Sequence, residues 1–297
     1  MFRLVLAALF AAAAWAGPAC GGHGGPDTLV VSTEWLAAHL HDPRLAILTV
    51  GDRPAYDRAH VPGAVFLSTQ NISSRSSALT LELPSMTELA DTFAAAGVSN
   101  DSRIVLYVGS GGRVIQATRI YLTLDAMGLG AQTSLLDGGL EAWQRENRPT
   151  SSESPVVKRG TLTPCPQNDV IVDSSYVASN LRHRGVDIVD ARAPEYYSGA
   201  STANGKRTGH IPGAVNLPFS TFVDAQGKLL PTATLRQMFQ SAGIQAGDRV
   251  VSYCHIGLQA TMVYFTARYL GYDARLYYGS WEDWSAQSAL PAETAQK

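Results

Sequence analysis

The chain has 297 residues, of which 45% are hydrophobic and 16% are charged, and its formal net charge is -2. This length and composition permit two domains of ordinary size, each with its own apolar core. A charge balance so close to neutral argues against a nucleic-acid-binding protein, which needs a broad basic surface. An anionic ligand would therefore need a local binding site.

Residues 1–26 are predicted to form a signal peptide and a tether, and they are excluded from the fold. A basic start at Arg3 precedes an apolar run over 4–14, and Ala14-Trp15-Ala16 has the small-residue pattern of a cleavage site. The run is too short to span a bilayer as a stable anchor. We therefore expect a periplasmic or secreted protein. The segment before Cys20 loosely resembles a lipoprotein processing site, so a lipid anchor at Cys20 stays open.

From Thr28 onward, short apolar runs alternate with helix-compatible segments. We expect helices from Ser32 or Thr33 to Leu40, over 87–96 with an end at Gly97, and over 116–127. Buried strands are predicted at 46–50, 104–108, 134–136 and 188–190. This alternation is typical of an α/β fold with a mainly parallel sheet and helices on both faces.

The same order of segments recurs in the second half of the chain. His60–Val65 is echoed by His210–Val215, an offset of 150 residues (210 minus 60). Gly97 is echoed by Gly243 at an offset of 146 (243 minus 97), and Trp143 by Trp284 at 141 (284 minus 143). Such matches in register indicate a duplicated domain. We predict domains over 28–146 and 169–290, a linker rich in Pro, Ser and Thr over 147–168, and a tail over 291–297.

Cys254 stands between a β-branched run at Val250 and Val251 and a helix-compatible run over 260–270. Loop amides and a helix N-terminus would both point toward its sulfur and stabilise an anion there. The alternative, a small buried apolar residue at a strand end, is common for unpaired cysteines. With only three cysteines in the chain, disulfides cannot be the main support of the fold, and we expect Cys165 to be incidental.

Together these segments resemble the tandem rhodanese-type sulfurtransferases, the family of thiosulfate and 3-mercaptopyruvate sulfurtransferases. The resemblance rests on the two His-x-Pro-Gly-Ala segments, the Cys254 loop and three further stretches: 135–139, 190–192 and 279–284. It implies two rhodanese-like domains, with a Cys254 thiolate that takes a sulfane sulfur as a persulfide and passes it to cyanide or a thiol. Val108 stands at the position of Cys254 in the first copy, so that domain is expected to be catalytically silent.

The residues after Cys254 form the predicted persulfide loop: His255, Ile256, Gly257, Leu258, Gln259 and Ala260. Their amides and the following helix dipole are expected to hold the anion without a dedicated base. Ala260 occupies the place of the arginine that Cys-x5-Arg phosphatases require, which excludes phosphoryl transfer. His255 either supplies positive charge at low pH or faces solvent.

Three cations are candidates for binding the donor. The resemblance implies that Arg192 meets the acidic group of the donor, and the alternative is a surface arginine paired with Glu195 or Asp190. Lys206 and Arg207 lie in an insertion just before His210, for which a solvated loop is the alternative. His60 and His210 occur in both copies, which favours structural hydrogen bonds over catalysis. No metal-ligand spacing is visible, and we expect no metal and no cofactor.

The loop contains neither the Arg and Lys of animal thiosulfate enzymes nor the Cys-Gly-Ser-Gly pattern of mercaptopyruvate enzymes. Lack of the latter pattern favours thiosulfate as the donor, with 3-mercaptopyruvate as the alternative. A non-enzymatic sulfur-carrier or anion-binding module is the second class of function, and an exported redox protein with a Cys165–Cys254 disulfide is the third. The physiological donor and acceptor and the oligomeric state are left open.

Overall fold

The computed structural model describes residues 29–74, 79–202 and 207–294. The predicted signal peptide, Cys20 and Lys206 therefore lie outside the described residues. Within the described ranges, no helix is long and apolar enough to cross a membrane.

Two five-stranded parallel sheets form the framework, which confirms the predicted α/β fold. The first has the order β1-β5-β4-β2-β3 and the second β6-β10-β9-β7-β8, so both halves share one topology. The strands of the first sheet are β1 (Val30–Val31), β2 (Leu45–Val50), β3 (Val65–Phe66), β4 (Arg103–Val108) and β5 (Thr133–Leu136). Those of the second are β6 (Ile171–Val172), β7 (Val186–Asp190), β8 (Val215–Asn216), β9 (Arg249–Tyr253) and β10 (Asp273–Tyr277).

Helices connect the strands in both halves, as the right-handed crossovers of parallel sheets require. The first half contains α2 (Thr33–His39), α3 (Arg53–Arg58), η1 (Thr69–Ile72), α4 (Met86–Ala95), α5 (Val114–Ala126), η2 (Gly130–Gln132) and α6 (Gly139–Arg145). The second contains α7 (Ser174–Ser179), α8 (Pro194–Ser198), η3 (Phe219–Thr221), α9 (Thr232–Ser241), α10 (Ala260–Leu270) and α11 (Ser280–Ala286). Ser32 is the cap of α2, because its hydroxyl accepts a hydrogen bond from the Trp35 amide.

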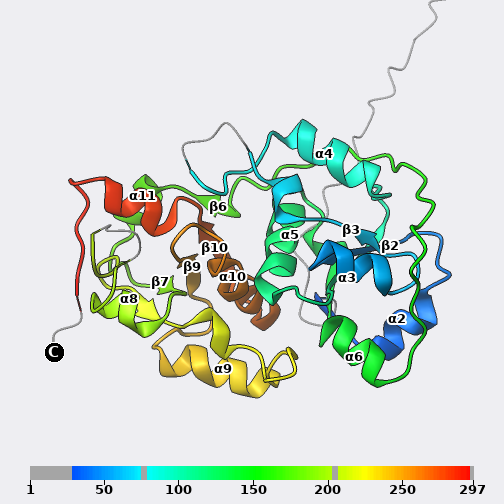
Figure 1. The fold of residues 1–297 in the computed structure, drawn as a ribbon. Helices are drawn as coiled ribbons and strands as arrows, with labels where there is room; N and C mark the ends of the chain where they lie inside the picture. Colours follow the sequence, from blue (N-terminus) through cyan, green and yellow to red (C-terminus); the bar gives the residue numbers. More distant parts are fainter. Residues whose placement is uncertain (1–28, 75–78, 203–206, 295–297) are drawn as a thin grey trace, which may run out of the picture.

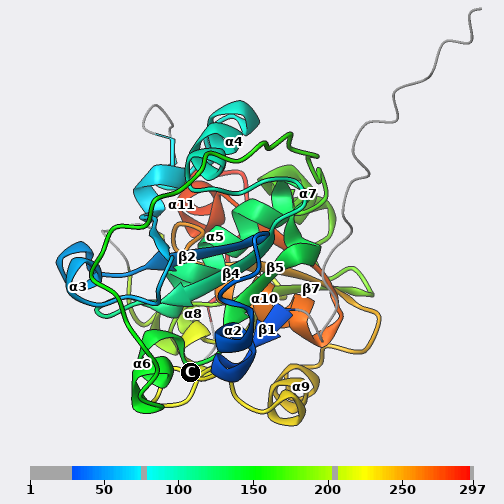
Figure 2. The same cartoon turned by 90° about the vertical axis from the view of Figure 1, so that its right-hand side faces the viewer.

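Each sheet is buried on both faces because alternate residues of its strands point to opposite sides. On β4, Ile104 and Leu106 join the core that contains α4 and α5, whereas Val105 and Tyr107 join the core that contains α2 and α6. Figure 2 shows α4 and α6 on opposite sides of the first sheet. The second sheet repeats this arrangement, with α9 and α10 on one face and α7 and α11 on the other.

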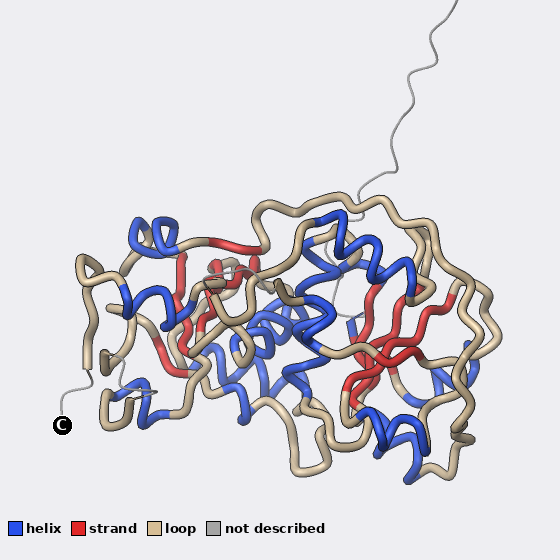
Figure 3. The backbone as a smooth tube through the Cα atoms, turned by 45° about the horizontal axis from the view of Figure 1, so that its top comes forward, coloured by secondary structure: helices blue, strands red, loops and turns tan. Residues whose placement is uncertain are grey.

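The two domains share a core along α5 and α10, which lie side by side at the centre of the molecule (Figures 1 and 3). The rings of Tyr121 and Phe265 meet edge to face, with centroids 4.9 Å apart. The Tyr264 hydroxyl donates to Asp125 Oδ2 over 2.5 Å, and Arg268 lies 3.5 Å from the same carboxylate. The interface is therefore a packed core with a buried polar network.

The chain between α6 and β6 runs along the surface of the first domain. Ser151 pairs with His60 through two backbone hydrogen bonds, and the Gly160 amide donates to Ala94 O over 2.8 Å. The domain limits 28–146 and 169–290 and the linker 147–168 stay predictions.

His60 and His210 have equivalent structural roles in the two domains. Each ring stacks on a tyrosine, Tyr56 or Tyr197, with centroids 4.1 Å and 3.9 Å apart. Each Nδ1 donates to the carbonyl of that same tyrosine, and both histidines are buried. Structural hydrogen bonds, the interpretation favoured by their presence in both copies, therefore account for both residues.

Candidate active site

Cys254 follows directly on β9, the central strand of the second sheet, and is 0% exposed. Its thiol is free, whereas Cys165 takes part in a disulfide. The redox hypothesis of a Cys165–Cys254 disulfide is therefore wrong, and so is the expectation that Cys165 is incidental. Helix α10 begins at Ala260, so the strand, thiol, loop and helix occur in the predicted order.

A turn after β10 supports the Cys254 loop from one side; we call residues 278–282 the cradle turn. The Cys254 amide donates to the Ser280 hydroxyl over 3.1 Å, and the Trp281 amide donates back to Cys254 O over 2.9 Å. The Glu282 amide donates to His255 O over 2.9 Å. Backbone and side chain of the cradle turn thus fix the start of the loop.

The loop packs against the cradle turn at Gly257. Its φ is +82°, and a Cβ atom there would lie 2.9 Å from Tyr278 O. A side chain at this position would meet both a left-handed backbone conformation and a carbonyl oxygen. The position accordingly requires glycine.

Five consecutive amides of the loop are left without acceptors. In the described part of the chain, the backbone N–H groups of residues 256–260 donate no hydrogen bond. Two carbonyls of the loop are engaged elsewhere: His255 O accepts from the Glu282 amide, and Leu258 O accepts from the Thr261 hydroxyl over 2.7 Å. A run of unpaired amides at the start of a helix is a site that favours an anion.

Arg192 is buried behind the site rather than open to solvent. It is 2% exposed, and its Nη2 lies 2.6 Å from Oδ2 of Asp190, which is 0% exposed. Nη2 also donates to Gly209 O over 2.7 Å, and the guanidinium lies 4.7 Å from the centre of the Trp281 ring. Burial alone would lower the pKa of Arg192, but Asp190 outweighs burial and raises it. Asp190 is the partner that the alternative named, but the pair is buried and does not lie on the surface as that alternative expected. Donor binding by Arg192 stays a prediction.

Arg207 is placed beside the cradle turn. Its guanidinium carbon lies 5.9 Å from the centre of the Trp281 ring, and its carbonyl accepts from Trp281 Nε1 over 2.8 Å. Nη1 donates to Leu290 O over 2.8 Å, but Nε and Nη2 are buried without a hydrogen-bond partner among the described residues. Arg207 therefore has unused donors beside the Trp281 ring.

Two side chains of the persulfide loop are held close to the rest of the domain. The His255 ring meets Tyr196 edge to face, with centroids 4.6 Å apart. Gln259 Oε1 is buried and finds no hydrogen-bond donor in the described ranges. This oxygen is a hydrogen-bond acceptor, so it does not add to the amide donors of the loop.

Sequence reasoning missed three residues that complete the site. Ser280 and Tyr278 lie in the cradle turn, more than twenty residues after Cys254, and although the stretch 279–284 carries the resemblance, no pattern predicted that its side chains hold the Cys254 loop. Arg119, 0% exposed in α5, donates to the Tyr278 hydroxyl over 2.6 Å from the other domain. An arginine among the apolar residues of a buried helix is the signal that could have indicated it.

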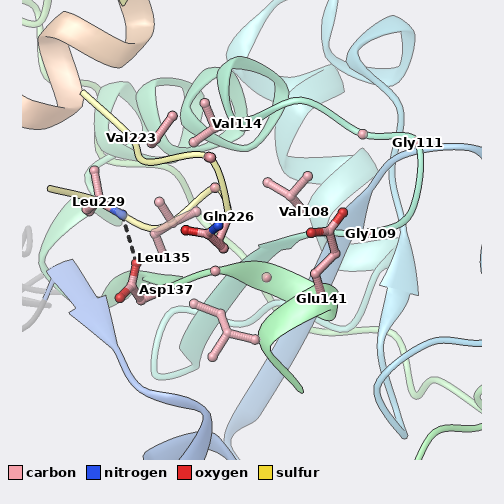
Figure 4. A pocket seen from close by; sticks show the side chains of 16 residues that line it. Val108, Gly109, Gly111, Val114, Leu135, Asp137, Glu141, Val223, Gln226 and Leu229 are labelled. Atoms are coloured by element: carbon pink, nitrogen blue, oxygen red, sulfur yellow. Dashed lines mark hydrogen bonds between the residues drawn. The ribbon is translucent and has the colours of Figure 1, made fainter. Parts of the chain in front are cut away.

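The equivalent edge of the first sheet forms a cavity of about 220 Å³ around Val108 (Figure 4). Gly109 and Gly139 line it from the first domain, and Gln226 and Leu229 cover it from the second. The Leu229 amide donates to Asp137 Oδ1 over 3.0 Å, and burial raises the pKa of Asp137. This edge lacks the thiol and presents carboxylates, so it does not reproduce the anion site at Cys254.

Comparisons with known proteins agree with this architecture. The family model described as "Rhodanese-like domain" matches the chain twice, over residues 32–146 and 173–287. A thiosulfate sulfurtransferase of Rattus norvegicus is 30% identical over 285 residues, which cover 89% of this chain and 94% of the relative. A 3-mercaptopyruvate sulfurtransferase of Rattus norvegicus is 31% identical over 273 residues, covering 86% and 91%.

Among solved structures, the anaerobic ergothioneine biosynthesis enzyme from Chlorobium limicola, in complex with trimethyl histidine, superposes with a TM-score of 0.78. It is 21% identical in sequence, and the match covers 91% of this chain and 71% of that chain. A likeness at this identity concerns the fold alone.

Proposed function

Because the chain belongs to the family of proteins with rhodanese-like domains, which occur in it twice, we propose that it is a sulfurtransferase. Cys254 carries the transferred sulfur, thiosulfate is the preferred donor, and the acceptor is a thiophile such as cyanide or a thiol. The observation that carries the proposal is the buried free thiol that leads into five unpaired amides at the start of α10.

The reaction has two steps that balance without a cofactor. The Cys254 thiolate attacks the outer sulfur of thiosulfate, the sulfur–sulfur bond of the donor breaks, and sulfite leaves with the bonding electron pair. The acceptor then attacks the terminal sulfur of the persulfide, and the Cys254 thiolate leaves with the electron pair of the enzyme's sulfur–sulfur bond. Thiolate and persulfide are both anions, so amides 256–260 and the N-terminus of α10 stabilise both states.

The cation proposed to meet an anionic donor is Arg207. Two of its guanidinium nitrogens are buried without partners in the described ranges, and it lies against Trp281 of the cradle turn. An arginine fork binds oxyanions through paired N–H groups, as sulfonate oxygens require. Lys206, its neighbour in the sequence, remains a second candidate for this role.

3-Mercaptopyruvate is the second candidate donor, supported by a relative of that name at 31% identity. Its carboxylate is as suitable for Arg207 as the sulfonate of thiosulfate. The loop sequence favours thiosulfate, because it lacks the Cys-Gly-Ser-Gly pattern. A direct comparison of kcat/KM for the two donors separates these alternatives.

The test is the intact mass of the protein before and after thiosulfate, and again after cyanide. We expect a gain of one sulfur on Cys254, its release as thiocyanate, and neither event in Cys254→Ser. A gain without turnover would favour the sulfur-carrier module. Absence of any gain with either donor, while the thiol is demonstrably free, would refute the proposal.

A second measurement tests the role of Arg207. Arg207→Gln is expected to raise KM for thiosulfate by about tenfold or more, because a charged hydrogen bond to the donor is lost. Arg182→Gln is the matched control, since Arg182 is exposed and pairs with Glu293. Equal KM values in the two variants would remove Arg207 from the donor site.

We also propose that the mature protein is exported to the periplasm or the medium. The leader pattern of residues 1–16 supports export, and so does the disulfide at Cys165, because disulfides persist in oxidising compartments. Cell fractionation with N-terminal sequencing checks this. A protein that retains Met1 in the cytosolic fraction would contradict it.

A further inference from the structure

We infer that the silent first domain positions the persulfide loop, through three contacts that end on His255, Gly257 and Leu258. This inference rests on the proposed function of the loop. It assigns positioning roles to Thr118, Arg119 and Thr80, none of which is near Cys254 in the sequence.

The first contact runs from α5 to the C-terminal part of the loop. The hydroxyls of Thr118 and Thr261 are 2.7 Å apart, and both residues are 0% exposed. Thr261 in turn donates to Leu258 O over 2.7 Å. A hydroxyl of the first domain therefore fixes the threonine that holds the carbonyl of Leu258.

The second contact runs from Arg119 through Tyr278 to Gly257. Arg119 Nη2 donates to the Tyr278 hydroxyl over 2.6 Å and to Leu81 O, and its guanidinium carbon lies 5.0 Å from the centre of the Tyr278 ring. The carbonyl of Tyr278 is the group that packs against Gly257. Tyr278 is thus fixed at its hydroxyl by one domain and meets the loop with its backbone.

Interface stability alone does not account for Arg119. It is 0% exposed and leaves Nε and Nη1 without partners among the described residues, none of which places a carboxylate in an ion pair with it. A buried cation without a carboxylate costs free energy relative to an apolar residue. Its contacts with Leu81 and Tyr278 are therefore a positioning arrangement.

The third contact starts from the segment that precedes α4. Thr80 donates through its hydroxyl to Glu282 Oε1 over 2.7 Å and through its amide to Oε2 over 3.0 Å. The Glu282 amide donates to His255 O over 2.9 Å. The first domain therefore fixes the residue that holds the carbonyl of His255.

These contacts orient the amides that would face the anion. A trans peptide is planar, so its C=O and the following N–H point in opposite directions. Fixing His255 O orients the amide of Ile256, and fixing Leu258 O orients the amide of Gln259. Both amides are unpaired among the described residues. The first domain thus sets the direction of two donors of the loop.

The chain offers a matched control. Tyr264, in α10, also donates to the first domain, over 2.5 Å to Asp125 Oδ2, and it is 0% exposed. Within the described ranges, its side chain forms hydrogen bonds or ring contacts with Asp125, Arg268 and Tyr121, and with no residue of the persulfide loop. Tyr278→Phe and Tyr264→Phe each remove one hydroxyl from the interface, but only the first touches the proposed positioning contacts.

The experiment compares Tyr278→Phe and Thr118→Val with Tyr264→Phe, and Thr118→Ser serves as the conservative rescue. Two readouts are used: the pH dependence of Cys254 alkylation by iodoacetamide, and kcat and KM for thiosulfate. We expect Tyr278→Phe and Thr118→Val to shift the alkylation profile to higher pH and to lower kcat about tenfold with little change in KM. Thr118→Ser and Tyr264→Phe should retain the wild-type profile.

An equal shift in Tyr264→Phe would show a general effect of interface loss and would overturn the inference, as would an unchanged profile in both Tyr278→Phe and Thr118→Val. Urea unfolding of each variant establishes that it is folded under the assay conditions. Alkylation requires no sulfur donor, so failure of the proposed function, seen as no persulfide in the wild type, is distinguishable from failure of this inference.

Discussion

Replacing Arg192 by Met separates the two roles considered for this residue. Arg192 and Asp190 are 2% and 0% exposed and lie 2.6 Å apart, so the substitution leaves a carboxylate in the core without its cation. Tyr253 still donates to Asp190 Oδ2 over 2.6 Å, but one phenol does not replace a charge. Breaking a buried ion pair costs about 3–5 kcal/mol. We expect a loss of this size in the free energy of unfolding.

The double variant Asp190→Asn with Arg192→Met is the control for the unpaired charge. The double variant should lose clearly less of its free energy of unfolding than Arg192→Met, because asparagine is neutral and still accepts a hydrogen bond from Tyr253. Urea unfolding gives the stability, and initial rates give KM for thiosulfate. A single variant with wild-type stability and a raised KM would refute the structural role and establish Arg192 as the donor-binding cation.

Three further predictions concern the second domain. Burial and the nearby Asp248 raise the pKa of Asp187 from 3.8 to about 6. The Asp187 carboxyl therefore binds its proton more tightly in the native state than in the unfolded state, and the free energy of unfolding falls as the pH rises from 3.8 to about 6. Asp187→Asn should therefore stabilise the protein at pH 7 by about 1 kcal/mol after allowance for solvent screening, with no gain at pH 3 in a urea titration. Gly257→Ala should lower the rate of sulfur transfer about tenfold or more, because a Cβ there meets Tyr278 O at 2.9 Å; wild-type turnover would contradict this. The free energy of unfolding of Ser280→Ala should be about 1 kcal/mol lower than that of Ser280→Gly, because residue 280 has φ +51° and alanine, unlike glycine, is strained in this left-handed conformation. Equal urea midpoints of the two variants would contradict this prediction.

The fold could be predicted from the sequence because its signals are local and occur twice. Strand β4 and helix α10 are continuous apolar segments with clear ends, and the repeated His-x-Pro-Gly-Ala turns mark the same point in both sheets. Helix starts are less accurately predicted: α5 begins at Val114, two residues before the predicted start, and Gln116, the predicted first residue, lies in the first turn, where its side chain accepts from the Arg113 amide. The periodicity indicates a helix, but hydrogen bonding decides where it begins.

The site could be predicted only as far as the chain around Cys254. The order of strand, thiol and helix is visible locally, but burial is not, so Arg192 could not be distinguished from an exposed cation. The residues that hold the loop, Ser280 and Tyr278, come from a separate turn, and Arg119 comes from the other domain. Such contacts depend on the packing of α5 against α10, for which one sequence contains no periodic signal.

The duplication explains why one copy can lose its chemistry while the fold is kept. At the position of Ser280 the first domain has Gly139, whose φ is +55° and whose Cβ would lie 2.5 Å from Val108 O. The turn therefore keeps its left-handed backbone in both copies. The first domain, however, lacks the thiol of Cys254 and also the Ser280 hydroxyl, which in the second domain accepts a hydrogen bond from the Cys254 amide. What it retains is α5, which packs on α10 as part of the shared core. Its tight packing makes the first domain suitable as a fixed support for the Cys254 loop, a role that requires rigidity and no nucleophile.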